Sequence, residues 1–214
     1  MLNLLIESTL ETLYMVGAST ICSLMMGFPL GVLLCVTSKG GLMPKVMLNQ
    51  VIGRIVNVFR SFPFIILMIL VFPLSRLIVQ TSIGTTATIV PLSVAAAPFV
   101  ARIIESALRE IDPQMIQAAR VMGSTNWQII RKVMVPEAMP AVVAGITLTI
   151  INIIGYSAMA GAIGGGGLGD LAIRYGYQRF RPELMAGAVI VIVVMVEAIQ
   201  FTGNSVANRM LKKR

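Results

Sequence analysis

Residues 112–136 read DPQMIQAARVMGSTNWQIIRKVMVP and form a polar, partly basic segment between two long apolar stretches. Asp112 followed by Pro113 predicts the start of a helix, because Asp caps a helix N-terminus and Pro fits its first turn. Gly123 is expected to end that helix, and Ser124 is expected to cap a second one. The segment is therefore predicted to be a helix–Gly–helix hairpin that projects from the apolar surroundings on either side of it.

The stretches around the hairpin belong to a strongly hydrophobic chain. Mean hydropathy is +0.88, and 57% of the 214 residues are hydrophobic. Only 12% are charged, against about a quarter in soluble domains. No charge occurs in 12–38, 77–101 or 138–169, and about 20 apolar residues suffice to cross a bilayer. The sequence therefore predicts an all-α integral membrane protein.

We expect five spans within a single domain that comprises residues 1–214. Their predicted ranges are 11–37, 57–78, 84–108, 138–161 and 184–208. The second range contains Pro63 and Pro73, so we expect a kinked helix whose freed carbonyls are satisfied by neighbouring helices. The N-terminus carries Glu7 and Glu11 without Lys or Arg, unlike a secretory signal, and the first span is expected to be retained.

The basic residues divide unevenly between the two ends of the predicted spans. One end holds Lys39, Lys45, Arg54, Arg60, Arg102, Arg109, Arg120, Arg131, Lys132, Arg209, Lys212, Lys213 and Arg214. The other end holds Arg76, Arg174, Arg179 and Arg181. Because Lys and Arg are enriched in cytoplasmic loops, the first set is assigned to the cytoplasm, with the N-terminus outside and the C-terminus inside. This anchoring accounts for the net charge of +8 without a nucleic-acid partner.

Three interpretations of the 112–136 hairpin are open from its shape alone. It could be an amphipathic loop on the membrane surface, a DNA-binding helix-turn-helix, or a docking element for a cytoplasmic partner. A hairpin held between two membrane helices could not place a recognition helix in a DNA groove. That argument disfavours the second interpretation.

The amino-acid sequence of the hairpin favours the third interpretation, a docking element for a cytoplasmic partner. They keep every interval of the EAA signature of ABC-importer permeases: Glu-Ala-Ala, three residues, Gly, nine residues, Ile, one residue, Leu-Pro. Gln117 stands in place of the usual Glu, and Val133 and Val135 stand in place of Ile and Leu. In that family the segment is a coupling helix that lies in a cleft of the ATP-hydrolysing subunit. The resemblance implies that the coupling residues are Gln117, Ala118, Ala119, Gly123, Trp127 and Pro136.

The resemblance extends over most of the chain. Residues 60–64 read RSFPF and look like the Arg-Ser-x-Pro opening of a permease helix, and residues 155–177 are similar to methionine-importer permeases. This implies a five-span type I ABC importer transmembrane domain that moves an amino acid, methionine in D or L form, by alternating access. The implied partners are a second copy of the chain, two ATP-binding cassette subunits and an extracytoplasmic substrate-binding protein. The setting would be a bacterial inner membrane.

The same resemblance implies that the chain is a transport subunit and not an enzyme, with ATP and Mg bound by the partner ATPase. The sequence itself contains no G-x-x-x-x-G-K-[ST] phosphate loop. It also contains no histidine, which excludes His-dependent triads and most zinc sites. We therefore expect no catalytic, cofactor-binding or metal-ligating residues in this chain.

The fourth predicted span carries small and polar side chains on one helical face. Thr149, Asn152, Tyr156 and Met159 follow Gly145 at helical spacing. They could line a translocation path, with Met159 as a gate, or they could pack against a neighbouring helix. Both interpretations stay open.

Two glycine motifs resemble chemical sites by chance. Gly164, Gly166 and Gly169 satisfy G-x-G-x-x-G but follow an apolar helix, whereas a dinucleotide site follows a strand. A flexible turn or a close approach of two backbones is expected there. Residues 167–170 match the Gly-x-Gly-Asp string of intramembrane aspartyl proteases, but the only other aspartate is Asp112, on the opposite membrane face.

The alternative function is an ion-coupled secondary carrier, a structural membrane scaffold, or a permease for another small amino acid or organic solute. A proton-driven carrier usually needs ionisable groups at membrane depth, and Glu197 is the one acid expected well inside a span. It is expected either to bond within the bundle or to line an inner vestibule. No inverted repeat is visible, and five spans cannot be divided evenly.

Overall fold

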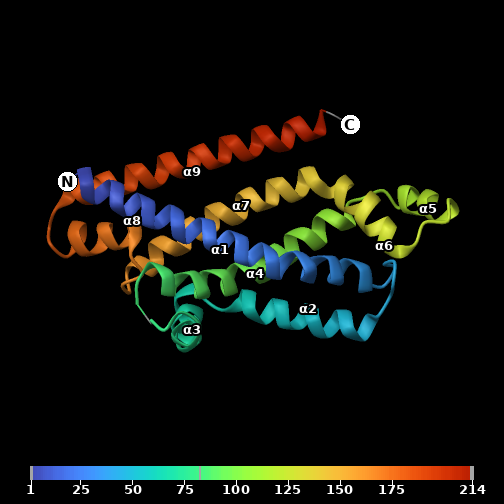
Figure 1. The fold of residues 1–214 in the computed structure, drawn as a ribbon, viewed down its shortest axis with the longest axis horizontal. Helices are drawn as coiled ribbons and strands as arrows, with labels where there is room; N and C mark the ends of the chain where they lie inside the picture. The colour runs from blue at the N-terminus through green and yellow to red at the C-terminus, as the bar shows by residue number, and fades with distance from the viewer. Residues whose placement is uncertain (1, 82, 213–214) are drawn as a thin grey trace.

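The computed structural model describes residues 2–81 and 83–212, which form a bundle of α-helices (Figure 1). Its long members are α1 (Leu2–Thr37), α4 (Thr85–Arg109), α7 (Val135–Gly161) and α9 (Pro182–Leu211). Within the described residues, four helices are long and apolar enough to cross a membrane, namely Leu2–Thr37, Thr85–Arg109, Asn126–Gly161 and Pro182–Leu211. The prediction of an all-α membrane protein is confirmed.

The most extensive helix packing in the bundle joins α1 to α4. A Cβ added to Gly27 would lie 2.6 Å from the Ala97 carbonyl oxygen, and one added to Gly31 would lie 2.5 Å from the Ala101 carbonyl oxygen. Small residues one turn apart let membrane helices approach until their backbones touch. The pair Gly27 and Gly31 is therefore the contact surface that sets the α1–α4 distance.

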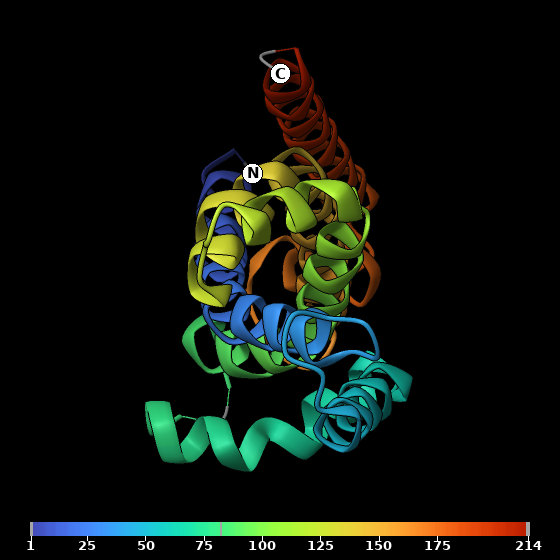
Figure 2. The ribbon, with the colours of Figure 1, turned by 90° about the vertical axis from the view of Figure 1, so that its right-hand side faces the viewer.

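The second predicted span differs from the sequence expectation. Instead of one kinked helix over 57–78, the chain forms α2 (Val46–Ser61) and α3 (Phe64–Val79), which meet at 109°. Helix α2 runs along the bundle, whereas α3 lies across it (Figure 2). The break follows from Pro63, which lacks an N–H and holds Phe62 in extended backbone with a ψ of 131°. A fifth span is formed only if this bent pair crosses the bilayer as a unit, and that stays a prediction.

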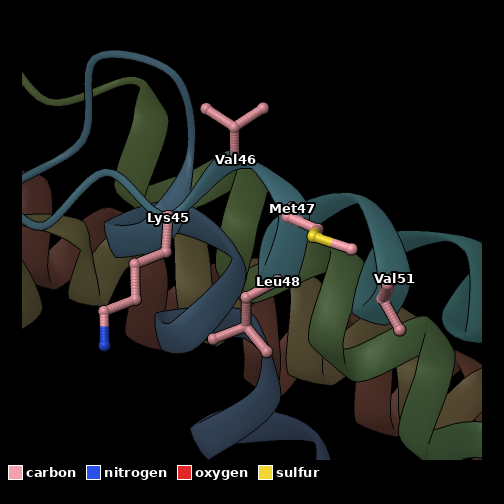
Figure 3. A pocket seen from close by; sticks show the side chains of 5 residues that line it. All are labelled: Lys45, Val46, Met47, Leu48 and Val51. Atoms are coloured by element: carbon pink, nitrogen blue, oxygen red, sulfur yellow. The ribbon is translucent and has the colours of Figure 1, made fainter.

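The first turns of α2 present apolar side chains to the outside of the chain. Figure 3 shows them with the neighbouring lysine: Lys45, Val46, Met47, Leu48 and Val51. The opposite face of α2 packs Val56 against Leu34 and Ala101, and Asn49 Nδ2 donates to the Leu34 carbonyl oxygen at 2.6 Å. The exposed face is thus left for lipid or for another chain.

The fourth span is longer than predicted. Helix α6 (Asn126–Ile129), a π-helical turn (Ile130–Met134) and α7 form one continuous helix from Asn126 to Gly161. Pro136, the last residue of the predicted hairpin, lies in the first turn of α7. The turn directly before it is π-helical, with wider-spaced backbone hydrogen bonds than an α-helix. This local change accommodates the missing N–H of Pro136, so the helix continues.

At the far end from the hairpin, α8 (Gly167–Asp170) and a π-helical segment (Leu171–Tyr177) form a return loop between α7 and α9. The Gly167 N–H donates to Glu11 Oε2 at 2.7 Å, and the Leu168 N–H donates to Thr12 Oγ1 at 2.9 Å. These two bonds fasten the return loop to α1.

Candidate functional site

The 112–136 hairpin begins and turns where the sequence predicts. Helix α5 (Pro113–Val121) starts with Asp112 Oδ1 accepting the Gln114 N–H at 2.8 Å. Gly123 has a φ of +80°, and its N–H donates to the Arg120 carbonyl oxygen at 2.9 Å. This left-handed conformation is easy for Gly and strained for other residues, so Gly123 sets the turn.

The cap of the second hairpin helix is Thr125, and the expectation for Ser124 was wrong. Thr125 Oγ1 accepts the Gln128 N–H at 3.3 Å, and Gln128 Oε1 accepts the Thr125 N–H at 2.9 Å. The two bonds form a capping box. Ser124 is still part of the preceding turn, since its N–H donates to the Ala119 carbonyl oxygen.

The hairpin rests on the neighbouring ends of α1 and α4. Ala119, Ile129 and Met134 are buried in one cluster with Cys35 of α1 and Leu108 of α4. Above this cluster, Arg120 Nη2 donates to the Leu42 carbonyl oxygen at 3.5 Å. The base of the hairpin is therefore part of the core, and a displacement of its outer part has to move the bundle as well.

The predicted coupling residues divide between the surface and the core. Gln117, Ala118, Gly123, Trp127 and Pro136 are exposed. Ala119 is only 3% exposed and belongs to the base of the hairpin. The coupling role of these residues stays a prediction.

The most exposed apolar side chains of the hairpin were missed by sequence reasoning. Val121 is 89% exposed and Met122 is 78% exposed, and we call these two residues the hairpin tip. Helical spacing puts Met122 on the same face as Ala119, which is buried. The turn at Gly123 ends the helix before that face continues, so the tip points outward. Exposed apolar residues beyond the bundle indicate a protein-binding surface.

Trp127 lies at one edge of a separate apolar groove. The groove has a volume of about 530 Å³, and its wall includes Phe28 and Val32 of α1 together with Arg131. Trp127 therefore lines the same groove as residues of α1.

The predicted path residues do not share one environment. Thr149 is 1% exposed, and its Oγ1 donates to the Gly145 carbonyl oxygen at 2.9 Å. Asn152 and Met159 are exposed, whereas Tyr156 is half-buried. Its ring stacks on Phe64, with centroids 4.5 Å apart and planes within 7°. The face is thus divided between packing and open surface, and its role as a path stays a prediction.

The acid that is buried is Glu105 and not Glu197. Glu105 is 4% exposed and accepts from Arg102 Nη1 at 2.6 Å and from Arg109 Nη2 at 2.7 Å. Glu197 is exposed on α9, and within the described residues it forms no hydrogen bond or ion pair. Sequence reasoning missed the burial of Glu105, because this residue stands close to the charged end of its span.

Arg102 extends the Glu105 network to α2. Its Nη2 donates to the Gly53 carbonyl oxygen at 3.1 Å and to Asn57 Oδ1 at 2.8 Å. A carboxylate and a guanidinium in this setting need such partners, because unpaired charges away from water are costly. The network fixes α2 against α4.

The glycine motifs have a packing role. A Cβ on Gly161 would lie 2.2 Å from the Asp170 nitrogen, and one on Gly169 would lie 2.3 Å from the Ala158 carbonyl oxygen. Close backbone approach, one of the two expectations, is therefore confirmed. Asp170 pairs with Arg174 and belongs to α8, which lies at the opposite end of the molecule from α5, the helix that Asp112 caps (Figure 1). Within residues 2–81 and 83–212, no cluster of three metal-ligating side chains occurs.

Comparison with known proteins identifies the family. Residues 12–212 match the family described as binding-protein-dependent transport system inner membrane component. A probable D-methionine transport system permease protein of Vibrio cholerae is 48% identical over 207 residues, which is 97% of this chain and 92% of that protein. A methionine import system permease protein of Bacillus subtilis is 44% identical over 94% of this chain and 91% of that protein.

A solved structure supports the same assignment. A chain of the MetNI methionine ABC transporter, in an inward-facing conformation, superposes with a TM-score of 0.96 and 45% identity. The match covers 98% of this chain and 97% of that chain. The likeness therefore includes the hairpin, the broken second span and the return loop as one fold. The chain belongs to the family of binding-protein-dependent transport system inner membrane components.

Proposed function

We propose that this chain is the permease subunit of an ATP-driven importer that moves methionine across the bacterial inner membrane by alternating access. Two copies would form the pore, joined by two ATP-binding cassette subunits and an extracytoplasmic methionine-binding protein. ATP and Mg would bind to the cassette subunits. The observation that carries this proposal is the near-complete match, in sequence and in fold, to methionine permeases.

The hairpin supplies the physical reason for an ATPase partner. Its tip is apolar and exposed, whereas its base is buried on α1 and α4. An ATPase cleft that covers Val121 and Met122 would remove apolar surface from water, at about 25 cal/mol per Å². Gln117, Ala118 and Gly123 lie on the exposed part of the same hairpin. The docking surface proposed here comprises these residues and the tip.

The proposed orientation places the hairpin and the C-terminus in the cytoplasm and the N-terminus outside. Arg109, Arg120, Arg131 and Lys132 gather at the hairpin end, which supports the positive-inside assignment. Lys213 and Arg214, which were counted with this end, lie outside the described residues. The proposed five-span topology treats α2 and α3 as one broken span.

Reconstitution tests the proposal directly. The chain, its ATPase and its binding protein are placed in vesicles, and uptake of radiolabelled L- and D-methionine is measured. We expect uptake that requires ATP on the hairpin side and the binding protein on the other. An ATPase variant that binds but cannot hydrolyse ATP is the matched control and should abolish accumulation. Uptake driven by a proton gradient without the ATPase would contradict the proposal in favour of a carrier.

A further inference from the structure

The elbow between α2 and α3 borders an open cavity that α4 and α7 also line. The cavity has a volume of about 250 Å³ and is lined on its aromatic side by Phe59, Phe62, Phe64, Phe99 and Tyr156. Phe99 stands near the middle of α4, and Tyr156 comes from the part of α7 nearer the return loop. Ligand pockets for drug-sized molecules are about 300–1,000 Å³, so this cavity suits one smaller solute.

One wall of the cavity is rigid. The Phe64 and Tyr156 rings stack at 4.5 Å, and Phe64 is only 8% exposed. Phe64 and Tyr156 also belong to the same apolar cluster as Met15 and Leu92. Offset-stacked rings of this kind are worth about 0.5–1.5 kcal/mol beyond their burial. The Phe64–Tyr156 part of the wall is therefore in place before any ligand enters.

Arg60 lines the same cavity and has no partner. Within the described residues it forms no hydrogen bond, ion pair or ring contact. Arg102 of α4, by contrast, is bonded to Glu105 and to Gly53 and Asn57 of α2. Asn57 is only three residues from Arg60 in the sequence. Arg60 is exposed on the open side of the cavity, and an ionisable side chain within a predicted span faces protein or water and is a candidate functional residue. Its guanidinium is therefore available to an anionic group in the cavity.

The elbow also offers acceptors for a cation. Helix α2 ends at Ser61 because Phe62 and Pro63 are extended, and the last carbonyls of a helix have no intrahelical donors. The C-terminus of a helix carries a partial negative charge, and interrupted membrane helices use such carbonyls to hold cations. One small cavity thus joins a guanidinium and an aromatic wall beside the last turn of α2.

We propose that the elbow cavity binds one zwitterionic amino acid with an apolar, thioether-type side chain during its passage through the membrane. Arg60 receives the carboxylate through paired hydrogen bonds, the α2 carbonyls receive the ammonium group, and the rings receive the side chain. Sulfur contacts with aromatic rings are favourable, and Arg matches a carboxylate in geometry as well as charge. This inference rests on the proposed function, because it names where the transported amino acid binds.

Direct binding to the permease–ATPase complex in lipid nanodiscs tests the site. Radiolabelled L-methionine is titrated to millimolar concentration without the binding protein. We expect Arg60→Gln to weaken binding at least tenfold and Arg60→Lys to weaken it less, since Lys keeps the charge but loses the planar fork. Arg54→Gln, which removes an arginine from another face of the same helix, should bind like wild type.

A second ligand separates a contact from a general structural effect. The wild type should bind 3-(methylthio)propylamine, which lacks the carboxylate, at least tenfold more weakly than methionine. The Arg60→Gln variant should bind the two ligands equally. Tyr156→Leu should weaken both ligands together, because it removes the ring stack and leaves the guanidinium.

The outcomes separate this proposal from the proposed function. Suppose that wild-type vesicles take up methionine with ATP and that Arg60→Gln binds methionine as tightly as the wild type. The cavity is then not the methionine-binding site, and the proposed function as a methionine permease is retained. The cavity is likewise not the site if Arg60→Gln still discriminates between the two ligands. If wild-type vesicles show no ATP-dependent uptake of methionine, the proposed function is overturned, and the assignment of ligand to the cavity is overturned with it.

Discussion

Gly123 carries the sharpest single-residue requirement of the hairpin. Its φ of +80° costs about 1–2 kcal/mol for a residue with a Cβ, and a β-branched residue tolerates it least. We expect Gly123→Val to distort the turn between α5 and α6 and to lower methionine uptake at least tenfold. Basal ATP hydrolysis by the partner should persist. Uptake and hydrolysis measured in the same vesicles check this.

The matched control for Gly123 is Gly84. It has a φ of +105°, and an added Cβ would meet open space, as at Gly123. Gly84→Val therefore strains the backbone at the far end of the molecule, where a φ of 105° with a ψ of 176° is essentially confined to Gly. It should leave the association of permease and ATPase unchanged. Wild-type uptake by Gly123→Val would show that the hairpin turn is not part of the coupling.

Single residues show where sequence reasoning succeeds and where it fails. Asp112 and Gly123 were predicted correctly, because a cap and a left-handed turn are local preferences of individual residue types. The exposure of Met122 does not follow from helical spacing, which puts it on the same face as the buried Ala119. The Arg102–Glu105 network escaped notice because its acceptors on α2 are 45 and 49 residues away in sequence.

Among the helices, the α1–α4 contact depends most clearly on the absence of side chains. Gly27→Ala would place a Cβ 2.6 Å from the Ala97 carbonyl oxygen, and overpacking of this kind costs about 1–3 kcal/mol. We expect a lower midpoint of thermal unfolding in detergent. On the same helix, Gly17 has nothing within 4 Å of an added Cβ.

Gly17→Ala is therefore the control for Gly27→Ala. It changes the same residue type in the same helix without a steric clash. Its unfolding midpoint should equal or slightly exceed that of the wild type, because Ala favours helix over Gly. Equal midpoints for both variants would mean that the two helices can move apart at no cost.

The elements that the sequence predicted well are the uninterrupted apolar helices. The predicted 84–108 and 184–208 agree closely with α4 and α9, since long neutral runs have a clear end at each charge. The α2–α3 pair was expected as a kinked helix, because the two prolines look alike in sequence. Pro73 lies inside α3, whereas Pro63 breaks the chain into two helices at 109°. Tertiary contacts on either side decide which proline bends and which one breaks.

For the whole molecule, the orientation in the membrane is the assignment to test. Val121 at the hairpin tip and Phe180 in the return loop are each 89% exposed and lie at opposite ends. In a chain carrying Cys22→Ala and Cys35→Ala, we expect Val121→Cys to react with an impermeant maleimide only in inverted vesicles. Phe180→Cys should react in intact cells. The reverse pattern would place the hairpin outside, where no ATP is available.

The overall architecture could be predicted because its signals are additive along the chain. Apolar runs indicated the spans, and the spacing of the hairpin motif indicated the family. The elbow cavity could not be predicted, because Arg60, Phe99 and Tyr156 are brought together only by the fold. The count of charges along the sequence assigned Arg60 to the hairpin end of its predicted span, whereas in the structure it lines the same cavity as Tyr156.

The unbroken helix from Asn126 to Gly161 has a mechanical consequence. Its 36 residues form a helix about 54 Å long at 1.5 Å per residue. If it pivots at its middle, a tilt of about 10° displaces each tip by roughly 5 Å in opposite directions, given that length. A displacement of the hairpin end of this helix would then move its return-loop end in the opposite direction. Opening of the space between helices at one end of the molecule and its closing at the other end would then occur in the same motion.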